Sequence, residues 1–251
     1  MLDFPFTRNE KSLPGQQCYI RRRQHMIPLG DIDRKPVRVP AVTIAIIGIN
    51  VSVFVLEMLF GSTFVIRWSY TPVEIISGRN LSTLLTAMFM HAGLLHIGGN
   101  MIFLWAFAPE IEDSMGRFRF SVFYLVGGLI ASMAQIMMIP DSNVPNLGAS
   151  GAIAAVMGAF LVSFPFDRIR TLVFLGLFVT VTLVPAVLLV GLWFLLQLFS
   201  EVGSFSRRDG AGVAYMAHVG GFVFGMLTGR LFMWRSLPGK ELNIDGRRAR
   251  T

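Results

Sequence analysis

Two polar residues in the apolar part of this sequence have the types needed for nucleophilic catalysis. Ser150 lies in the string Gly148-Ala149-Ser150-Gly151, and His218 stands at the start of a later apolar stretch. A serine hydroxyl is a poor nucleophile until a base takes its proton, and histidine is the usual base. The pair Ser150 and His218 is therefore the candidate catalytic unit, with Ser150 as the nucleophile and His218 as the general base.

A second group of polar residues could stabilise the charge that such a reaction develops. His96 and Asn100 are four residues apart, so they share one face of a helix one turn from each other. These two side chains and the Ser150 backbone N–H, beside Gly148, could donate hydrogen bonds to the oxyanion of a tetrahedral intermediate. We expect His91, near the start of the same helix, to support the site structurally.

Two other interpretations of these histidines stay open at this point. A single histidine in an apolar span often does no more than form a hydrogen bond between helices. A metal site is disfavoured, because His91 and His96 are five residues apart, whereas one helical face needs a spacing of four. No thiol or well-placed carboxylate completes a ligand set, so we do not expect a metal ion.

The composition indicates an integral membrane protein. The 251 residues are 53% hydrophobic and 15% charged, whereas soluble proteins average about 25% charged. The single cysteine, Cys18, excludes a disulfide framework and a cysteine-based metal site. The basic residues lie outside the apolar spans, which is typical of topology signals rather than of a nucleic-acid-binding surface. The lipid bilayer is therefore the expected environment, and no nucleic-acid partner is expected.

The apolar stretches predict an all-α protein with six transmembrane helices, at roughly 41–60, 82–108, 119–139, 150–165, 171–199 and 212–233. The long stretch 171–199 contains Pro185, and we place its helix at about 183–200. The β-branched residues before it suit an interfacial or re-entrant segment packed on protein. This choice assumes that Ser150 and His218 lie near the same membrane face.

The helix that begins at Ser150 should be short. From Ser150 to Pro165 it would span only about 23 Å, which is less than the ~30 Å hydrocarbon core. Ser150 is therefore predicted to lie below the outer membrane surface, in a recessed site that water can reach.

The distribution of basic residues predicts the orientation in the membrane. Of the 22 Lys and Arg residues, 18 fall in the segments that this topology places inside, and four fall in the outer loops. The positive-inside rule then puts both termini in the cytoplasm. We predict a loose basic tail at 1–40, a membrane domain at 41–234 and a second basic tail at 235–251.

Small residues predict that the helices carrying Ser150 and His218 pack closely, because small side chains allow two helix backbones to approach. They recur at every fourth position, at Ala154 and Gly158 after Ser150, and at Gly221, Gly225 and Gly229 in the helix of His218. Gly151 and Gly221 are the expected structural residues beside the site. The acidic residues flanking the Ser150 helix, Asp141 and Asp167, lie in loops on opposite sides, so the sequence predicts a Ser–His dyad without a carboxylate.

Taken in order, these motifs resemble the rhomboid family of intramembrane serine proteases. The resemblance rests on the string from Met90 to Asn100, on Glu112-Asp113-Ser114-Met115-Gly116-Arg117, on Gly148–Gly151 and on Ala217-His218-Val219-Gly220-Gly221. It implies a six-helix core that cleaves single-span or other membrane-anchored proteins near the outer face, without a metal or cofactor. It also implies a bacterial inner membrane location.

The same resemblance gives two further expectations. Ala108-Pro109 departs from the family pattern and should alter how the second long helix ends. Met26-Ile27-Pro28-Leu29 resembles the usual start of bacterial members, so residues 1–25 would be a dispensable extension or a wrongly assigned start. Two alternatives to a protease remain: a catalytically silent rhomboid-like chaperone that binds membrane helices, and a transporter with a histidine relay, which lacks support from internal symmetry.

Overall fold

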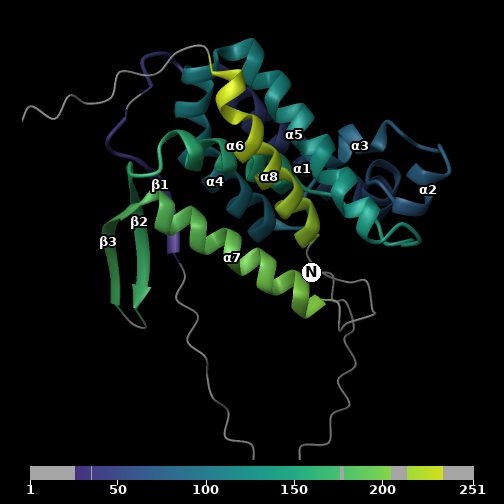
Figure 1. The fold of residues 1–251 in the computed structure, drawn as a ribbon. Coiled ribbons are helices and arrows are strands. Elements are labelled where there is room, and N and C mark those ends of the chain that lie inside the picture. Colours follow the sequence, from purple (N-terminus) through teal and green to yellow (C-terminus); the bar gives the residue numbers. More distant parts are fainter. Residues whose placement is uncertain (1–25, 35, 176–177, 205–213, 234–251) are drawn as a thin grey trace, which may run out of the picture.

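The protein is mostly helical. The computed structural model describes residues 26–34, 36–175, 178–204 and 214–233. The longer helices are α1 (Ala41–Trp68), α4 (Leu94–Met115), α5 (Arg117–Met138), α6 (Ser150–Ser163), α7 (Ala186–Ser204) and α8 (Tyr215–Phe232). Short α2 (Pro72–Ile76), α3 (Thr83–Thr86) and a 3₁₀ turn (Ala87–Phe89) connect α1 to α4. Figure 1 shows the long helices packed side by side in one bundle.

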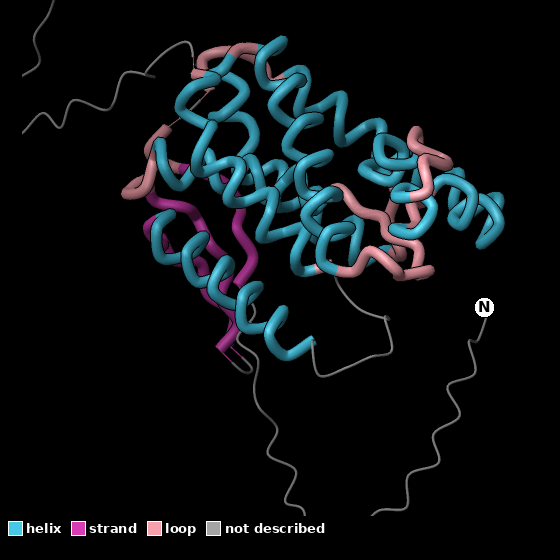
Figure 2. The backbone as a smooth tube through the Cα atoms, turned by 45° about the vertical axis from the view of Figure 1, so that its right-hand side comes forward, coloured by secondary structure: helices cyan, strands magenta, loops and turns pink. Residues whose placement is uncertain are grey.

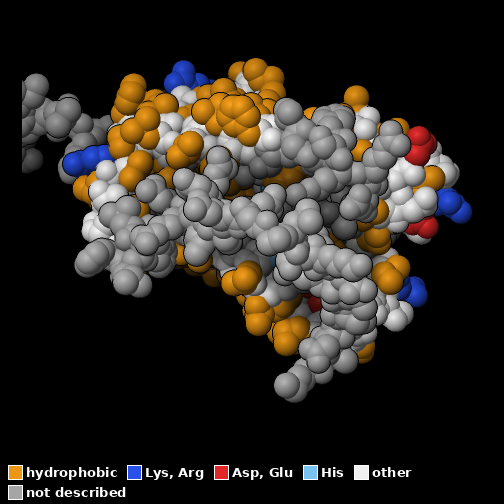
Figure 3. All heavy atoms as spheres, turned by 90° about the horizontal axis from the view of Figure 1, so that it is seen from below, with side chains coloured by type: hydrophobic (Ala, Val, Ile, Leu, Met, Phe, Trp, Pro, Cys, Tyr) orange, Lys and Arg blue, Asp and Glu red, His pale blue; other side chains and the backbone are white. Residues whose placement is uncertain are grey.

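The bundle belongs to an integral membrane protein. Within the described ranges, the three helices α1, α4 and α5 are long and apolar enough to cross a bilayer, and α6 and α7 contain shorter apolar helices. Many large apolar side chains also point outward, including Leu95 (94% exposed) and Leu227 (74% exposed). Figure 3 shows hydrophobic side chains gathered on one face of the molecule, with most of the visible charged side chains near its two ends. A lipid environment accounts for this exposure.

Helix α6 forms the centre of the bundle. Every residue from Gly151 to Phe160 is buried, and α4, α5, α7 and α8 all pack against this helix. Its sequence lacks charged residues and is apolar all round, as expected for a helix surrounded by other helices. Ser150 is therefore held by a helix whose position is fixed on every side.

Helices α6 and α8 are in direct backbone contact. A methyl group added at Gly225 would lie 1.9 Å from the carbonyl oxygen of Ala155, and one added at Gly221 would lie 2.1 Å from that of Gly151. Gly158 is similarly enclosed, with the carbonyl oxygen of Phe222 at 2.2 Å. The predicted close packing is confirmed. The α6 residues in contact with Gly221 and Gly225 are Gly151 and Ala155. Each is one position later in the sequence than the small-residue face predicted from Ser150 and Ala154.

A three-stranded antiparallel sheet accompanies the helices, which the all-α prediction missed. Strands β1 (Met26–Asp31), β2 (Arg168–Leu175) and β3 (Phe178–Pro185) pair in the order β1-β2-β3. They lie together at one side of the helical bundle (Figure 2). The prediction of a loose tail is wrong for Met26–Asp31, because these residues pair with β2 through backbone hydrogen bonds.

The sheet also corrects the interpretation of the segment before α7. The β-branched run there forms the hairpin of β2 and β3, since such residues favour extended backbone. The expectation of an interfacial or re-entrant segment did not include this strand pairing. Helix α7 begins at Ala186, directly after Pro185, close to the predicted start of the fifth long helix. Proline lacks an N–H, so it suits the end of an edge strand that precedes a helix.

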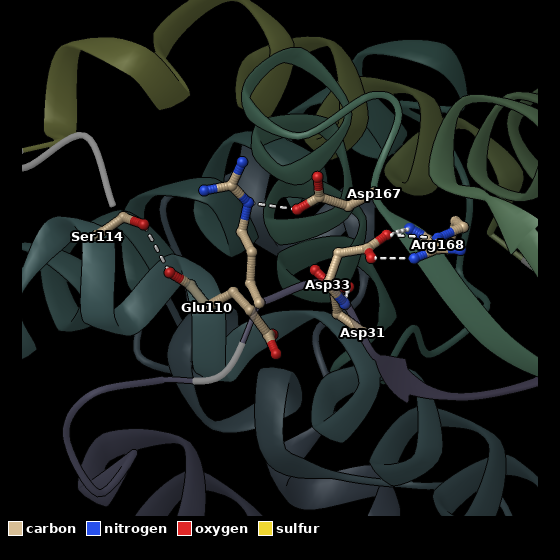
Figure 4. Close-up of polar contacts among 7 residues, drawn as sticks. Asp31, Asp33, Glu110, Ser114, Asp167 and Arg168 are labelled. Carbon is tan, nitrogen blue, oxygen red and sulfur yellow. Dashed lines mark hydrogen bonds and ion pairs between the residues drawn. The ribbon is translucent and has the colours of Figure 1, made fainter. Parts of the chain in front are cut away.

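Ion pairs join the segment after β1 to the start of β2 and to the loop between α6 and β2. Arg168 donates its Nη2 to Asp33 Oδ1 at 2.6 Å and its Nε to Asp33 Oδ2 at 3.0 Å, while Arg34 pairs with Asp167. Figure 4 shows Asp31 beside these groups. Burial raises the pKa of Asp31 from 3.8 to about 7, and the negative charge of Asp167 adds to this rise, against the hydrogen bond from the Asp33 backbone. Asp31 therefore keeps its proton to a higher pH than an ordinary aspartate does.

Glu112 links α4 to the start of α1. Its buried carboxylate accepts hydrogen bonds from the backbone N–H groups of Val42 (2.9 Å) and Thr43 (2.8 Å) and from Thr43 Oγ1 (2.7 Å). The first N–H groups of a helix have no partner within the helix, and a negative charge is favourable there. Glu112 thus caps α1 from a distant part of the chain.

Helix α4 differs from the predicted second long helix at both ends. It begins at Leu94 and not near residue 82, because the chain is non-helical from Met90 to Gly93. It also continues past Pro109 to Met115, since proline is tolerated inside such helices where neighbouring groups satisfy the backbone. The expected effect of Ala108-Pro109 relative to the family pattern stays a prediction. Gly116, with φ of 78°, alone separates α4 from α5.

Residues 1–25 and 234–251 lie outside the described residues. The expectations about a dispensable N-terminal extension and about a C-terminal basic tail concern these residues and stay predictions.

Candidate active site

Ser150 is the first residue of α6, and the turn that positions it requires a glycine. Gly148 has φ of 137°, which L-residues with side chains rarely adopt, and its N–H donates to the carbonyl of Ala87 at 2.9 Å. Because the first residues of a helix lack an i−4 partner for their N–H groups, the Ser150 N–H is available to a ligand. The turn therefore presents the Ser150 hydroxyl and an N–H donor together.

His218 lies in the first turn of α8 and reaches Ser150. Its Nε2 is 2.7 Å from Ser150 Oγ, and the histidine is 8% exposed. The close contact between α6 and α8 at Gly151 and Gly221 makes this distance possible, because any side chain at Gly221 would separate the two helices. The structure brings together the serine and the histidine that the sequence paired.

A third polar residue, Gln197 of α7, contacts the other side of the imidazole. His218 Nδ1 lies 2.8 Å from Gln197 Oε1. The Trp193 ring, one turn earlier on α7, is centred 5.8 Å from the His218 ring, and the Tyr215 ring is centred 6.4 Å from it. As a polar residue in an apolar stretch, Gln197 was already a functional candidate from the sequence, but without a predicted partner. Trp193 and Tyr215 were not predicted, although the spacing of Trp193 and Gln197 on one helical face was a signal that could have linked those two.

His96 is held in a defined orientation beside Ser150. Its Nδ1 accepts a hydrogen bond from the backbone N–H of Ala92 at 3.2 Å. In the neutral ring the proton is therefore on Nε2, which makes Nε2 a donor. A methyl group added at Gly148 would lie 3.3 Å from His96 Nε2 and 3.5 Å from Ser150 Oγ, so one point in space is within reach of both a nucleophile and a donor.

Asn100 follows His96 by one helical turn and is 8% exposed. Its Nδ2 is buried and has no hydrogen-bond partner among the described residues. An unpaired buried donor costs about 1–3 kcal/mol, so such a group is favourable only where a ligand can accept its hydrogen bond. Asn100 and His96 are thus two donors on one face of α4.

His91 differs from its prediction, because it lies before α4 and not on it. Its backbone N–H donates to the Glu57 carboxylate of α1 at 3.0 and 3.2 Å. Its ring packs edge-on against that of His96, with centroids 5.1 Å apart. The non-helical segment Met90–Gly93 is therefore fastened to α1, and His91 supports the position of His96.

A cleft of about 770 Å³ opens next to these residues. Its lining includes His96, Ser150 and His218, together with the backbone-rich segment Pro145–Leu147 and Leu94–Leu95. The volume is in the range of clefts that bind ligands, and an extended peptide segment could approach Ser150 through it. Within the part of the chain that the structure describes, no cluster of His, Cys, Asp and Glu side chains could hold a metal ion.

The chain matches a known protein family over most of this region. The family model described as the rhomboid domain matches residues 78–235, which includes every residue of the site from His91 to His218. The protein belongs to the rhomboid family.

Named relatives support this assignment. The chain is 28% identical over 192 residues to rhomboid protein 1, mitochondrial, of Saccharomyces cerevisiae, which covers 74% of this chain and 51% of the relative. It is 32% identical over 111 residues to the rhomboid protease GluP of Bacillus subtilis (43% of this chain, 21% of the relative). It is 33% identical over 99 residues to the human presenilin-associated rhomboid-like protein, mitochondrial (39% and 26%). This rhomboid chain spans about half or less of these relatives.

Proposed function

We propose that this rhomboid is an intramembrane serine endopeptidase that cleaves transmembrane segments of membrane-anchored proteins. The observation that carries the proposal is the 2.7 Å contact between Ser150 Oγ and His218 Nε2 beside a cleft. The name of the Bacillus subtilis relative, a rhomboid protease, supports the same activity. Alternatively, the protein would bind membrane helices without cleaving them.

In the proposed reaction His218 takes the proton of Ser150 as Oγ attacks the scissile carbonyl carbon. The resulting tetrahedral intermediate carries a negative oxygen, and this oxygen would accept hydrogen bonds from the Ser150 N–H, His96 Nε2 and Asn100 Nδ2. Protonated His218 then gives its proton to the leaving amine, and water hydrolyses the acyl-serine by the reverse sequence.

The orphan Nδ2 of Asn100 and the donor tautomer of His96 support this assignment of the oxyanion site. Gly148 contributes by leaving the space between His96 and Ser150 open. Donors fixed before the reaction lower the barrier because they need not reorganise as charge develops.

The topology belongs to the same proposal. Six crossings by α1, α4, α5, α6, α7 and α8, with both termini in the cytoplasm, put the starts of α6 and α8 at the outer face. The short distance between Ser150 and His218 supports a chain that crosses the membrane once between α6 and α8, through α7, because both residues then lie near the same membrane face. The protein would lie in a bacterial inner membrane, although several relatives carry the word mitochondrial in their names.

Substrates would be single-span or other membrane-anchored proteins with helix-destabilising small residues near the outer face, because a helix must unwind before its carbonyl can be attacked. The test is cleavage of a tagged single-span substrate by the wild type and by Ser150→Ala in the same bilayer. We expect the variant to lose about 10⁴–10⁶-fold in rate. Retained cleavage would reject the assignment, and a wild type that binds the substrate without cleaving it would favour the chaperone.

A further inference from the structure

We propose that Gln197 is a positioning residue for His218, so that the catalytic unit is Ser150–His218–Gln197 with a neutral amide as its third member. This inference rests on the proposed protease function. It starts from one contact, the 2.8 Å distance between His218 Nδ1 and Gln197 Oε1, together with the 2.7 Å contact on the opposite ring nitrogen.

The two contacts fix the tautomer of the histidine. An amide oxygen only accepts hydrogen bonds, so Gln197 Oε1 requires the proton of the neutral ring to be on Nδ1. The lone pair of Nε2 then faces the Ser150 hydroxyl and can take its proton. With the opposite tautomer, Nε2 would carry a hydrogen and could not act as a base, which makes the Nδ1 contact decisive for the reaction.

Aromatic rings restrict the imidazole in the remaining directions. Trp193 lies at an interplanar angle of 41° to His218, and Tyr215 meets it almost perpendicularly, at 85°. Trp193 and Gln197 come from the same face of α7, so this helix supplies both a packing surface and a hydrogen-bond acceptor. The neighbours of Gln197 on this helix, Leu196 and Leu198, are exposed apolar residues. Placing a polar amide in such an apolar stretch costs free energy unless the amide forms a hydrogen bond.

A neutral acceptor suits this position better than a carboxylate would. In the described part of the protein, the hydrogen bonds and ring contacts of His218, Gln197 and Trp193 involve no Arg, Lys, Asp or Glu side chain. A charged group here would need its own solvation in an apolar bundle, whereas an amide orients the ring at a smaller desolvation cost. The amide therefore performs the orienting task of the aspartate in soluble serine proteases.

The experiment compares Gln197→Leu, Gln197→Asn and Gln197→Glu in the full chain in bicelles. Leu removes the acceptor, and Asn is one methylene too short to reach Nδ1. We expect both to lower kcat about tenfold, with KM unchanged, since a lost hydrogen bond worth about 1.4 kcal/mol changes a rate by that factor. Their rate of labelling at Ser150 by a fluorophosphonate should fall by the same factor, because labelling needs the base but not the substrate.

Gln197→Glu keeps both the reach and the acceptor, so at alkaline pH its kcat should be well above that of the Leu and Asn variants. The acid limb of its rate profile should move to higher pH, because a carboxylate beside the ring favours the imidazolium. A merely structural role would produce neither the rescue nor this displacement. Leu196→Ala, at the exposed neighbouring position, is the matched control and should behave as the wild type.

The possible failures can be distinguished. If the wild type cleaves and is labelled at Ser150, but the Leu and Asn variants match it in kcat, labelling rate and pH profile, Gln197 has no positioning role and the protease proposal stands. If Gln197→Leu and Gln197→Glu lose activity equally, a structural role replaces the proposed one. If wild-type Ser150 is neither labelled nor needed for cleavage, both proposals are overturned.

Discussion

Replacing Gly225 with alanine tests whether the close contact of α6 and α8 sets the geometry of the site. The new methyl carbon would lie 1.9 Å from the carbonyl oxygen of Ala155 and 2.9 Å from its Cα. Carbon and oxygen atoms that are not bonded need about 3.0–3.4 Å, so the two backbones must separate by about 1 Å at this level. Gly225 is about two turns from His218 along α8, far enough that the substitution contacts neither catalytic side chain.

Such a separation would lengthen the Ser150–His218 contact, now 2.7 Å, beyond the range of a good hydrogen bond. We expect kcat to fall about 10²-fold, as for a misplacement of about 1 Å, and the free energy of unfolding to fall by about 1–3 kcal/mol. Rate of cleavage, fluorophosphonate labelling and thermal unfolding in bicelles measure these effects.

Gly48→Ala on α1 is the matched control, because a methyl group there would meet nothing within 4 Å. It should leave the rate unchanged. The reasoning is refuted if Gly225→Ala is labelled, cleaves substrate and unfolds as the Gly48→Ala variant does, since the two helices would then tolerate the methyl group without moving apart.

Three further predictions concern other parts of the molecule. Asn100→Ala should lower kcat about 10²-fold by removing one oxyanion donor, measured as single-turnover cleavage; an unchanged rate would exclude this role. Because burial raises the pKa of Asp31 to about 7, folded protein binds a proton that unfolded chain releases above pH 3.8, so stability from this group falls as pH rises from about 4 to 7. The melting temperature of the wild type should therefore fall between pH 5 and pH 8, and the fall should be smaller in Asp31→Asn. An equal pH dependence in both proteins would contradict this prediction. Glu112→Gln should lower the free energy of unfolding by about 1–3 kcal/mol, and Thr43→Val, which removes only the hydroxyl contact, by about 1 kcal/mol; calorimetry that reversed this order would reject the capping role.

Part of the site could be predicted from the sequence because the bilayer makes polar residues conspicuous. Ser150, His218, His96 and Asn100 stand out in apolar stretches, and the every-fourth spacing of small residues indicated which two helices approach each other. Gln197 stood out equally, but which residue it faces depends on how α7 lies against α8, and a one-dimensional pattern contains no information about that.

The secondary structure was harder to predict where apolar residues suit both helix and strand. The run before Pro185 is apolar and β-branched and forms β3, which pairs with β2. Strand β2 in turn pairs with Met26–Asp31, which joins segments more than 130 residues apart in the chain. Such distant pairing has no local signal. His91 was placed on a helix because apolar residues surround it, whereas the chain there is held in a non-helical conformation by the Glu57 carboxylate.

The sequence by itself determined the membrane environment, the resemblance to the rhomboid family and the candidate serine, histidine and two donors, because charge, hydropathy and residue spacing are local properties of the chain. Only the tertiary structure decided that the glycines of α8 lie against Gly151 and Ala155, that His96 presents Nε2 as a donor, and that α7 brings Gln197 to His218. These features depend on distances between helices and on the direction of each hydrogen bond, which are fixed only when the helices pack.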